Sequence, residues 1–415
     1  MGPVHDAAAH PIRASPSTQA HAQECAAGEH FEGDHERVWA GPSGGGKHTV
    51  LEFLDEDAKN DGAMMCRNAS GHRLLTLVTL TSLLTLVLGL AGCTSSPDDG
   101  SSSGRDGTNG GGAPLHPERP GCAGNAYAET LPTNASLDGL SFSAASSQQY
   151  LLDALDLRFP LGKFIVSEGL TSPYAPTQKN CFEQYFTEVS SAPKVLLQAS
   201  QIVHECGHYL DLGKAKDPTS VYVIREDLSF SCEQGDTTDR KGMTFARSRI
   251  RKDAYATKRR TCGADETAKG CDFYADIYLN GDPDDAKFES GDQGYNLLLE
   301  EASQYVNSLA TALAFEDAHK RGSRITERDG ILTFLWYIER YLKLAKESYP
   351  DTYAFIHSNA CWRQVTLTIW DRAWFYLNAT KTMSELGLDA EALEELVRDE
   401  TLTAEIDALR ALECQ

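Results

Sequence analysis

Residues 193–212 read PKVLLQASQIVHECGHYLDL, and this stretch has the features of a single helix. Ser191 stands where an N-cap is expected, Pro193 suits the first turn, and Gly213 is a common stop signal. Apolar residues flank the central HECGH on both sides, and no proline interrupts it. The pattern therefore predicts one continuous helix over 193–212.

The two histidines of this helix stand four residues apart, in His204-Glu205-Cys206-Gly207-His208. Residues at this spacing lie on one helix face, one turn apart, so both imidazoles can reach a single ion. Glu205 follows the first His and can approach a water molecule bound to that ion. The motif predicts half of a zinc site, with His204 and His208 as ligands and Glu205 as the catalytic base.

These residues resemble the HExxH motif of the zincin metallopeptidases, in particular zincins with Gly just before the second His. One zincin branch extends the motif to HExxHxxGxxH, but here Asp211 and Lys214 occupy the two added positions, which excludes that branch. The gluzincin branch instead takes a Glu ligand from a second, downstream helix. The resemblance implies an α+β fold with a zincin-like core around the HExxH helix, zinc as cofactor, and hydrolysis of peptide bonds.

Residues 297–307, LLLEEASQYVN, match such a second helix. At about 100° per residue, its apolar stripe consists of Leu298, Ala302, Tyr305, Val306, Leu309 and Leu313. Glu301 lies at the edge of this stripe, whereas Glu300 lies on the opposite side. Because a buried carboxylate needs a cation or hydrogen bonds, we expect Glu301 to be the third ligand and Glu300 to be solvated. An exposed acidic pair near the helix start is the alternative.

The resemblance also implies a Tyr or His that donates to the developing oxyanion, close to the third-ligand helix. Tyr295, six residues before Glu301, is the first candidate, and Tyr305 and His357 follow it. The acidic residues between 282 and 292 do not have the spacing of an EF-hand loop, so we interpret them as a solvated loop.

The segment from Arg67 to Cys93 has the features of a secretory signal: basic residues, an apolar run over 74–90, and small residues before a polar stretch. Its end, Leu90-Ala91-Gly92-Cys93, resembles the bacterial lipoprotein signal, in which cleavage precedes the Cys and the thiol receives a lipid. The sequence therefore predicts a signal peptide over 64–92 and lipidation of Cys93. An uncleaved membrane-spanning helix is the alternative.

A start at Met64 or Met65 would place this signal at the N-terminus, so we interpret residues 1–63 as a mis-assigned upstream or disordered segment. The lipoprotein resemblance implies a membrane-anchored protein of the bacterial cell envelope, facing the periplasm or the exterior. Thr94, rather than Asp, follows the lipidated Cys, which favours the outer membrane by resemblance to known sorting signals.

The remaining chain divides by composition into three parts. Residues 93–121 are rich in Ser, Gly and Pro and are expected to form a flexible tether. Residues 122–320 are predicted to be the catalytic domain and 321–415 a mainly helical C-terminal lobe. Within them we predict strands at 163–166 and 220–230 and helices at 147–159, 295–320, 328–348, 361–378, 388–398 and 402–413.

Cysteine usage and charge indicate the compartment and restrict the partners. Eight of the eleven Cys follow Cys93, and in an exported protein they are expected to form disulfides, with Cys262 and Cys271 the first candidate pair. Cys206, inside the HExxH helix, could instead be a buried thiol. The net charge of −22 opposes binding to nucleic acid.

Two functions remain open at this point. The first is a zinc peptidase that acts on peptides or proteins and is held at a membrane by its N-terminal lipid. The second is a non-catalytic binding or scaffold lipoprotein of the cell surface or periplasm, in which the HExxH motif is degenerate.

The lipoprotein prediction is tested by the mass of the mature chain. We expect a protein that begins at Cys93, carries the added mass of its acyl chains, and partitions into detergent, because the apolar run ends directly before that Cys. Intact-mass spectrometry of protein from bacterial membranes measures this. A chain that keeps Met1, or an unmodified Cys93, would contradict the prediction.

Overall fold

The computed structural model describes residues 37–40, 47–50, 118–320, 322 and 324–415. The predicted signal peptide, Cys93 and the tether up to residue 117 lie outside the described residues. Strand β1 (Arg37–Ala40) pairs antiparallel with β2 (Lys47–Val50). In the part of the chain that is described, no helix combines the length and apolar character needed to cross a bilayer.

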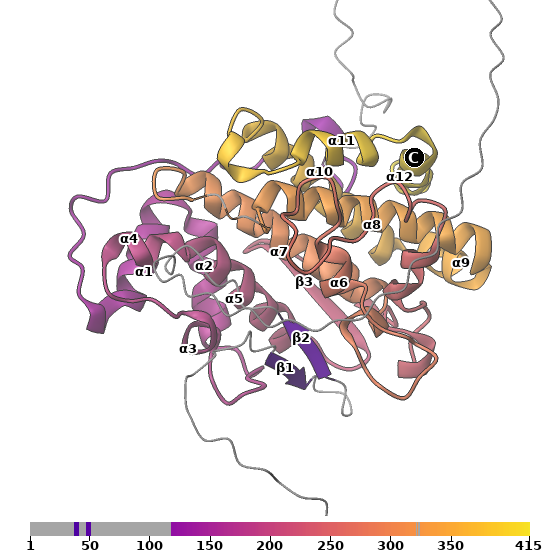
Figure 1. The fold of residues 1–415 in the computed structure, drawn as a ribbon, viewed down its shortest axis with the longest axis horizontal. Coiled ribbons are helices and arrows are strands. Elements are labelled where there is room, and N and C mark those ends of the chain that lie inside the picture. Colours follow the sequence, from indigo (N-terminus) through magenta and orange to yellow (C-terminus); the bar gives the residue numbers. More distant parts are fainter. Residues whose placement is uncertain (1–36, 41–46, 51–117, 321, 323) are drawn as a thin grey trace, which may run out of the picture. The chain divides into compact units, whose positions relative to one another are not determined.

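From residue 118 onward the described chain is rich in helix and contains one small sheet (Figure 1). The helices are α1 (Ser147–Arg158), α2 (Pro160–Leu170), α3 (Cys181–Tyr185), α4 (Ala192–Leu197), α5 (Ala199–Lys214), α6 (Tyr274–Tyr278), α7 (Tyr295–Ala314), α8 (Glu327–Ser348), α9 (Pro350–Ser358), α10 (Ala360–Ala379), α11 (Ala390–Val397) and α12 (Glu400–Glu413). Strands β3 (Thr219–Arg225) and β4 (Leu228–Glu233) form an antiparallel pair. This mixed, helix-rich composition is compatible with the predicted α+β class.

Several helices begin where a polar side chain satisfies free backbone N–H groups. Asn180 and Glu183 form a reciprocal capping box at the start of α3. Asn359 accepts from the first N–H groups of α10, and Asp399 accepts from the N–H of Thr401 in α12. Each cap therefore marks a helix start that the local sequence specifies.

The predicted continuous helix over 193–212 is wrong, because the chain divides it into α4 and α5 at Gln198. The side-chain amide of Gln198 folds back: its Oε1 accepts from the N–H of Glu188 and its Nε2 donates to the carbonyl of Glu188. Helix α5 then continues one residue past Gly213, to Lys214, so this glycine does not stop it.

The other secondary-structure predictions are partly confirmed. Residues 163–166 belong to α2 rather than to a strand, since Pro160 starts a new helix directly after α1. The predicted strand 220–230 is a hairpin, in which Tyr222 lies opposite Phe230. Helix α9 was not predicted. The helices predicted near 147–159, 328–348, 361–378, 388–398 and 402–413 are present with small shifts at their ends, whereas the helix predicted over 295–320 ends at Ala314.

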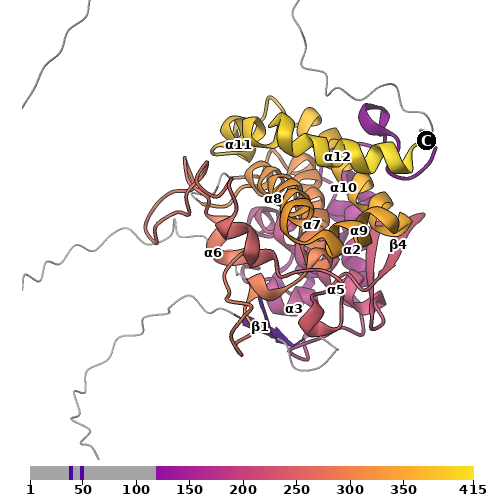
Figure 2. The same cartoon turned by 90° about the vertical axis from the view of Figure 1, so that its right-hand side faces the viewer.

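Helix α7 packs against α5, α8 and α10, and α12 lies along α8 and α10 (Figure 2). One cluster of buried apolar side chains includes Leu151, Val203, Leu309, Leu335 and Leu409. This core extends without interruption from the predicted catalytic part into the helices that follow residue 320.

All eight Cys after Cys93 form disulfides, which confirms the prediction. The pairs are Cys122–Cys414, Cys181–Cys206, Cys232–Cys361 and Cys262–Cys271. The predicted pair Cys262–Cys271 is correct, and Cys206 is a disulfide partner rather than a thiol. The Cys122–Cys414 bond joins two ends of the described domain that are 292 residues apart.

Glu339 of α8 makes the stability of the fold depend on pH. Its side chain is fully buried, and neither carboxylate oxygen has a hydrogen-bond partner among the described residues. Burial raises the pKa of Glu339 well above its usual 4.5, and the carboxylates of Asp399 and Asp407 add to this. The folded protein therefore keeps a proton that the unfolded chain releases, so this residue lowers stability progressively as the pH rises above 4.5.

We expect Glu339→Gln to be more stable than the wild type at neutral pH, because the amide has no proton to lose. The advantage should grow with pH by up to about 1.4 kcal/mol per pH unit and vanish near about pH 4. Urea denaturation of both proteins at several pH values measures it. A stability difference that stays constant with pH would contradict the explanation.

Candidate metal centre

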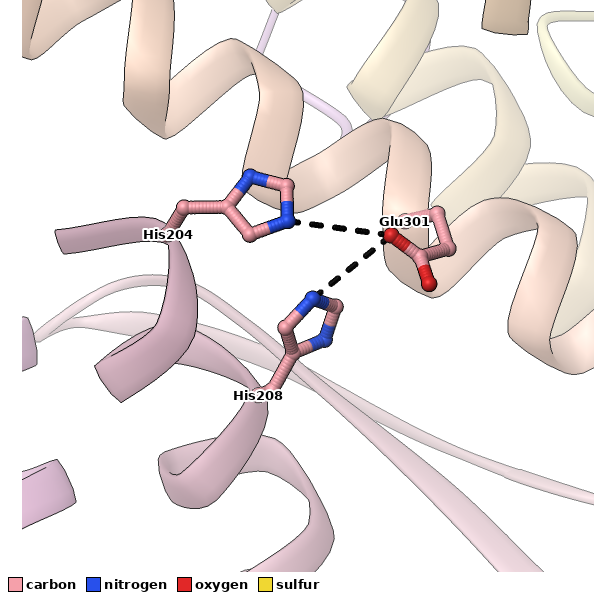
Figure 3. A group of neighbouring side chains, drawn as sticks. All are labelled: His204, His208 and Glu301. Atoms are coloured by element: carbon pink, nitrogen blue, oxygen red, sulfur yellow. Dashed lines mark ion pairs between the residues drawn. The ribbon is translucent and has the colours of Figure 1, made fainter. Parts of the chain in front are cut away.

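Helices α5 and α7 bring three side chains together that could hold a metal ion: His204, His208 and Glu301 (Figure 3). One ligand atom from each lies within 4.8 Å of the others. The two imidazole rings belong to successive turns of α5, with their centroids 4.7 Å apart. The ligand set expected from the sequence is therefore assembled in the fold, although 92 residues separate His208 from Glu300, the neighbour of Glu301.

The distances within this group fit a small divalent ion. Oε2 of Glu301 lies 3.7 Å from Nε2 of His204 and 3.5 Å from Nε2 of His208. Ligand atoms placed tetrahedrally around an ion at ordinary zinc–ligand bond lengths are about 3.4 Å apart. The same oxygen is buried and accepts no hydrogen bond from the described residues. One carboxylate oxygen and two ring nitrogens therefore lie close enough together to bind the same ion.

The outer nitrogen of each imidazole is held by a residue of α7. Nδ1 of His204 lies 3.0 Å from Oγ of Ser308, and Nδ1 of His208 lies 2.6 Å and 2.7 Å from the two oxygens of Glu300. A carboxylate at Nδ1 keeps the proton there and leaves the Nε2 lone pair for a metal. Both rings are thereby oriented with Nε2 toward Glu301.

The prediction that Glu300 is solvated is wrong, since this side chain is only 4% exposed. The helical projection correctly separated two faces of α7. The face opposite the apolar stripe, however, is buried as well, and it is lined by the polar residues Gln304, Asn307 and Thr311. Glu300 is therefore the hydrogen-bond partner of a ligand and not a surface residue.

Glu205 is buried beside the ligands, and its Oε2 accepts no hydrogen bond in the described part of the chain. Burial raises the pKa of Glu205 to about 8; His208 opposes this shift, and Glu301 and Glu300 add to it. A divalent cation at the ligand group would favour the carboxylate form instead. Glu205 is thus placed where its proton affinity depends on the charge between the ligands.

The proton affinity of His208 also follows from its neighbours. Burial alone would lower the pKa of His208, but the Glu300 and Glu301 carboxylates outweigh it and raise the pKa to about 10. For His204, burial dominates and lowers the pKa. A metal ion would have to displace the proton on Nε2 of His208, so metal affinity should weaken in acid.

Two of the three predicted oxyanion donors make their hydrogen bonds away from the ligand group. Tyr295 is fully buried at the start of α7, and its hydroxyl hydrogen-bonds Oγ1 of Thr366 in α10. His357 belongs to α9, where its Nδ1 lies 2.9 Å from the carbonyl of Tyr353. The structure therefore does not bring Tyr295 or His357 to the ligand group.

The third predicted donor, Tyr305, does lie at the ligands. Its ring packs edge-on against His204, with centroids 4.9 Å apart, and its hydroxyl lies 3.0 Å from the hydroxyl of Tyr278. Arg247 is buried nearby: it donates to the carbonyl of Tyr278, and its charge helps to lower the pKa of Glu301. Neither Tyr278 nor Arg247 was among the predicted site residues, because no motif marks them: Tyr278 ends the short helix α6, and Arg247 starts a 3-10 helix over Arg247–Lys252.

Gly207 allows α5 and α7 to approach this closely. A Cβ atom at this position would lie 1.9 Å from Oε1 of Gln304, so any larger residue would displace that side chain. At the preceding residue of α5, a Cβ at Gly169 of α2 would lie 2.4 Å from the carbonyl oxygen of Cys206. The metal-ligand helix is therefore held between two helices at glycine contacts.

The chain matches no protein-family model, no curated protein and no solved structure.

The role of Glu300 can be tested by metal affinity. We expect Glu300→Ala to weaken zinc binding by about 10- to 100-fold, because His208 loses the group that orients its ring and fixes its proton. Competition with a chromophoric chelator measures the affinity. The matched control is Glu316→Ala, because Glu316 is exposed and lies just beyond the end of α7. This variant should bind zinc like the wild type. Equal affinities for Glu300→Ala and Glu316→Ala would contradict this role.

Proposed function

We propose that this protein is a zinc-dependent peptidase of the bacterial cell envelope, built on a zincin-like core and anchored through a lipid on Cys93. The observation that carries the proposal is the convergence of His204, His208 and Glu301 with Glu205 beside them on the same helix turn. Two imidazoles and one carboxylate are a common ligand set of catalytic zinc.

The number of ligands supports a catalytic rather than a structural ion. Structural zinc sites use four protein ligands, usually with several Cys thiolates, whereas catalytic sites use three and leave one position for water or substrate. Here every Cys of the described residues belongs to a disulfide, so none of them is a thiolate ligand. The three-residue group found here has the catalytic composition.

In this proposal each residue has a separate task. Zinc, when bound, supplies a Lewis acid for the scissile carbonyl and lowers the pKa of the attacking water. Glu205 accepts the proton of that water and delivers it to the leaving amine. Glu300 and Ser308 orient the imidazoles through their Nδ1 atoms. The Tyr305 ring fixes the position of His204 from the side.

The cell-envelope location is supported by the disulfides and by the lipoprotein-like signal sequence. Four disulfides in one domain are typical of a protein that folds outside the reducing cytosol. The partners in this proposal are peptide or protein substrates and the membrane that holds the lipid anchor.

If Glu205 is the general base, one variant of it should lose activity while it keeps the metal. We expect Glu205→Gln to keep zinc but to lose about 10²- to 10⁴-fold in hydrolysis, because only proton transfer is removed. His208→Ala should lose both zinc and activity. Metal analysis and cleavage of a mixed peptide library measure the two properties.

Glu168→Gln is the matched control, since Glu168 is a half-buried residue of α2 that pairs with Lys214. It should resemble the wild type in both measurements. A wild-type protein that binds zinc but cleaves no peptide would refute the peptidase and favour the scaffold function. A wild-type protein that binds no zinc would refute the metal centre itself.

A further inference from the structure

A row of buried polar side chains continues from the metal ligands along one face of α7 to α10. Arg372 of α10 donates from Nη1 to Oδ1 of Asn307, at 2.7 Å, and Nδ2 of Asn307 donates to Oε1 of Gln304, at 2.8 Å. All three side chains are 1% exposed. These bonds therefore lie in the interior, where an unsatisfied polar group is costly.

The row ends at the carboxylates around His208. Nε2 of Gln304 donates to Oδ2 of Asp211 at 2.9 Å and lies 3.5 Å from Oε1 of Glu300. Glu300 in turn accepts from Nδ1 of His208. A continuous set of hydrogen bonds thus connects a guanidinium on α10 with a metal ligand on α5.

Arg372 fixes the direction of the amide hydrogen bonds from its end of this row, and the carboxyl groups of Asp211 and Glu300 favour the same direction from the other end. The two ends of an amide have nearly the same shape, so its partners decide which end is the donor. A guanidinium only donates, which forces the carbonyl of Asn307 toward Arg372 and its NH₂ toward Gln304. The NH₂ of Gln304 must then face Asp211 and Glu300. With the opposite orientation, the carbonyl of Gln304 would face these carboxyl groups, and two acceptor oxygens cannot form a hydrogen bond.

Arg372 is itself held by the N-terminal strap, which we define as residues 118–142. Nε of Arg372 lies 3.0 Å and 3.2 Å from the two oxygens of Glu129, and the Tyr376 hydroxyl also donates to this carboxylate. The Cys122–Cys414 disulfide fixes the strap to the segment after α12. The strap, which overlaps the end of the predicted tether at 118–121, therefore contacts the same guanidinium that orients the amides.

We propose that Arg372 is a positioning residue of the metal centre, which acts on His208 through Asn307, Gln304 and Glu300, and that the strap supports it through Glu129. This inference rests on the metal site of the proposed function. Arg372 touches none of the three ligands. Its effect on the metal passes through the orientation of the two amides.

The test compares zinc affinities of full-length variants by chelator competition. We expect Arg372→Met to bind zinc about tenfold more weakly than the wild type, as for other residues that support a ligand from outside. Arg372→Lys retains a side chain that only donates and should stay within about threefold. Glu129→Gln should weaken binding in the same direction as Arg372→Met, and by less.

If Arg372→Met does not fold, a second variant, Asn307→Asp, tests the amide orientation on its own. In Asn307→Asp the new carboxylate has the shape of the amide and still accepts from Arg372, but it cannot donate to Gln304. We expect the same loss of zinc affinity. In the cobalt(II)-substituted protein the visible absorption should also change, because it reports the ligand geometry.

The control is Arg340→Met. Arg340 of α8 forms an ion pair with Asp253 that is as buried as the pair of Arg372 and Glu129. It makes no hydrogen bond to Asn307, Gln304 or Glu300. It should lower the unfolding temperature but leave zinc affinity unchanged. Equal zinc affinity in the wild type, Arg372→Met and Asn307→Asp, or an equal loss in Arg340→Met, would overturn the inference and leave the proposed function standing. Absence of zinc binding in the wild type would overturn both.

Discussion

The contact between α5 and α7 at Gly207 is the constraint on which the candidate site depends. Without a Cβ at this position, Gln304 of α7 lies directly against the backbone of α5. This approach brings Glu301 to the two imidazoles and Glu300 to the outer nitrogen of His208. Helix α2 contacts the neighbouring residue of α5, Cys206, through Gly169, and the Cys181–Cys206 disulfide joins α3 to the same residue. Helix α5 is therefore held by α7, α2 and α3 around Cys206 and Gly207, as a site with preset ligand geometry requires.

Both faces of helix α7 are buried, and its polar face is stabilised by pairing rather than by solvent. A buried charge costs several kcal/mol unless an opposite charge or hydrogen bonds compensate it. Glu300 faces His208, and Glu301 faces both imidazoles with Arg247 nearby. Glu339 of α8 lacks such a partner, and burial raises its pKa well above the usual value, which favours the neutral acid form. Buried acids thus take opposite roles in this fold, according to whether a cation meets them.

Two of the disulfides join segments that are far apart in the sequence. Cys232–Cys361 links β4 to α10, and Cys122–Cys414 closes the strap onto the C-terminal segment. Closing such long loops restricts the unfolded chain and stabilises the fold by a few kcal/mol per bond in the chain-entropy account. The strap is therefore part of the folded domain, and the same segment contacts Arg372 in the interior. The beginning of the domain is therefore linked by hydrogen bonds to the helix that carries Glu300 and Glu301.

The sequence by itself determined the local features of this protein. The four-residue spacing of His204 and His208 and the amphipathic edge position of Glu301 follow from helix periodicity, which is a property of neighbouring residues. The even number of Cys after Cys93 likewise indicated disulfides without reference to the fold. Only the tertiary structure decided whether the polar face of α7 meets solvent or another helix, and therefore whether Glu300 is a surface residue or the partner of His208. It also decided the break at Gln198 and three of the four disulfide pairings. These depend on contacts between residues far apart in the chain, and local propensity carries no information about which distant surface a helix face will meet.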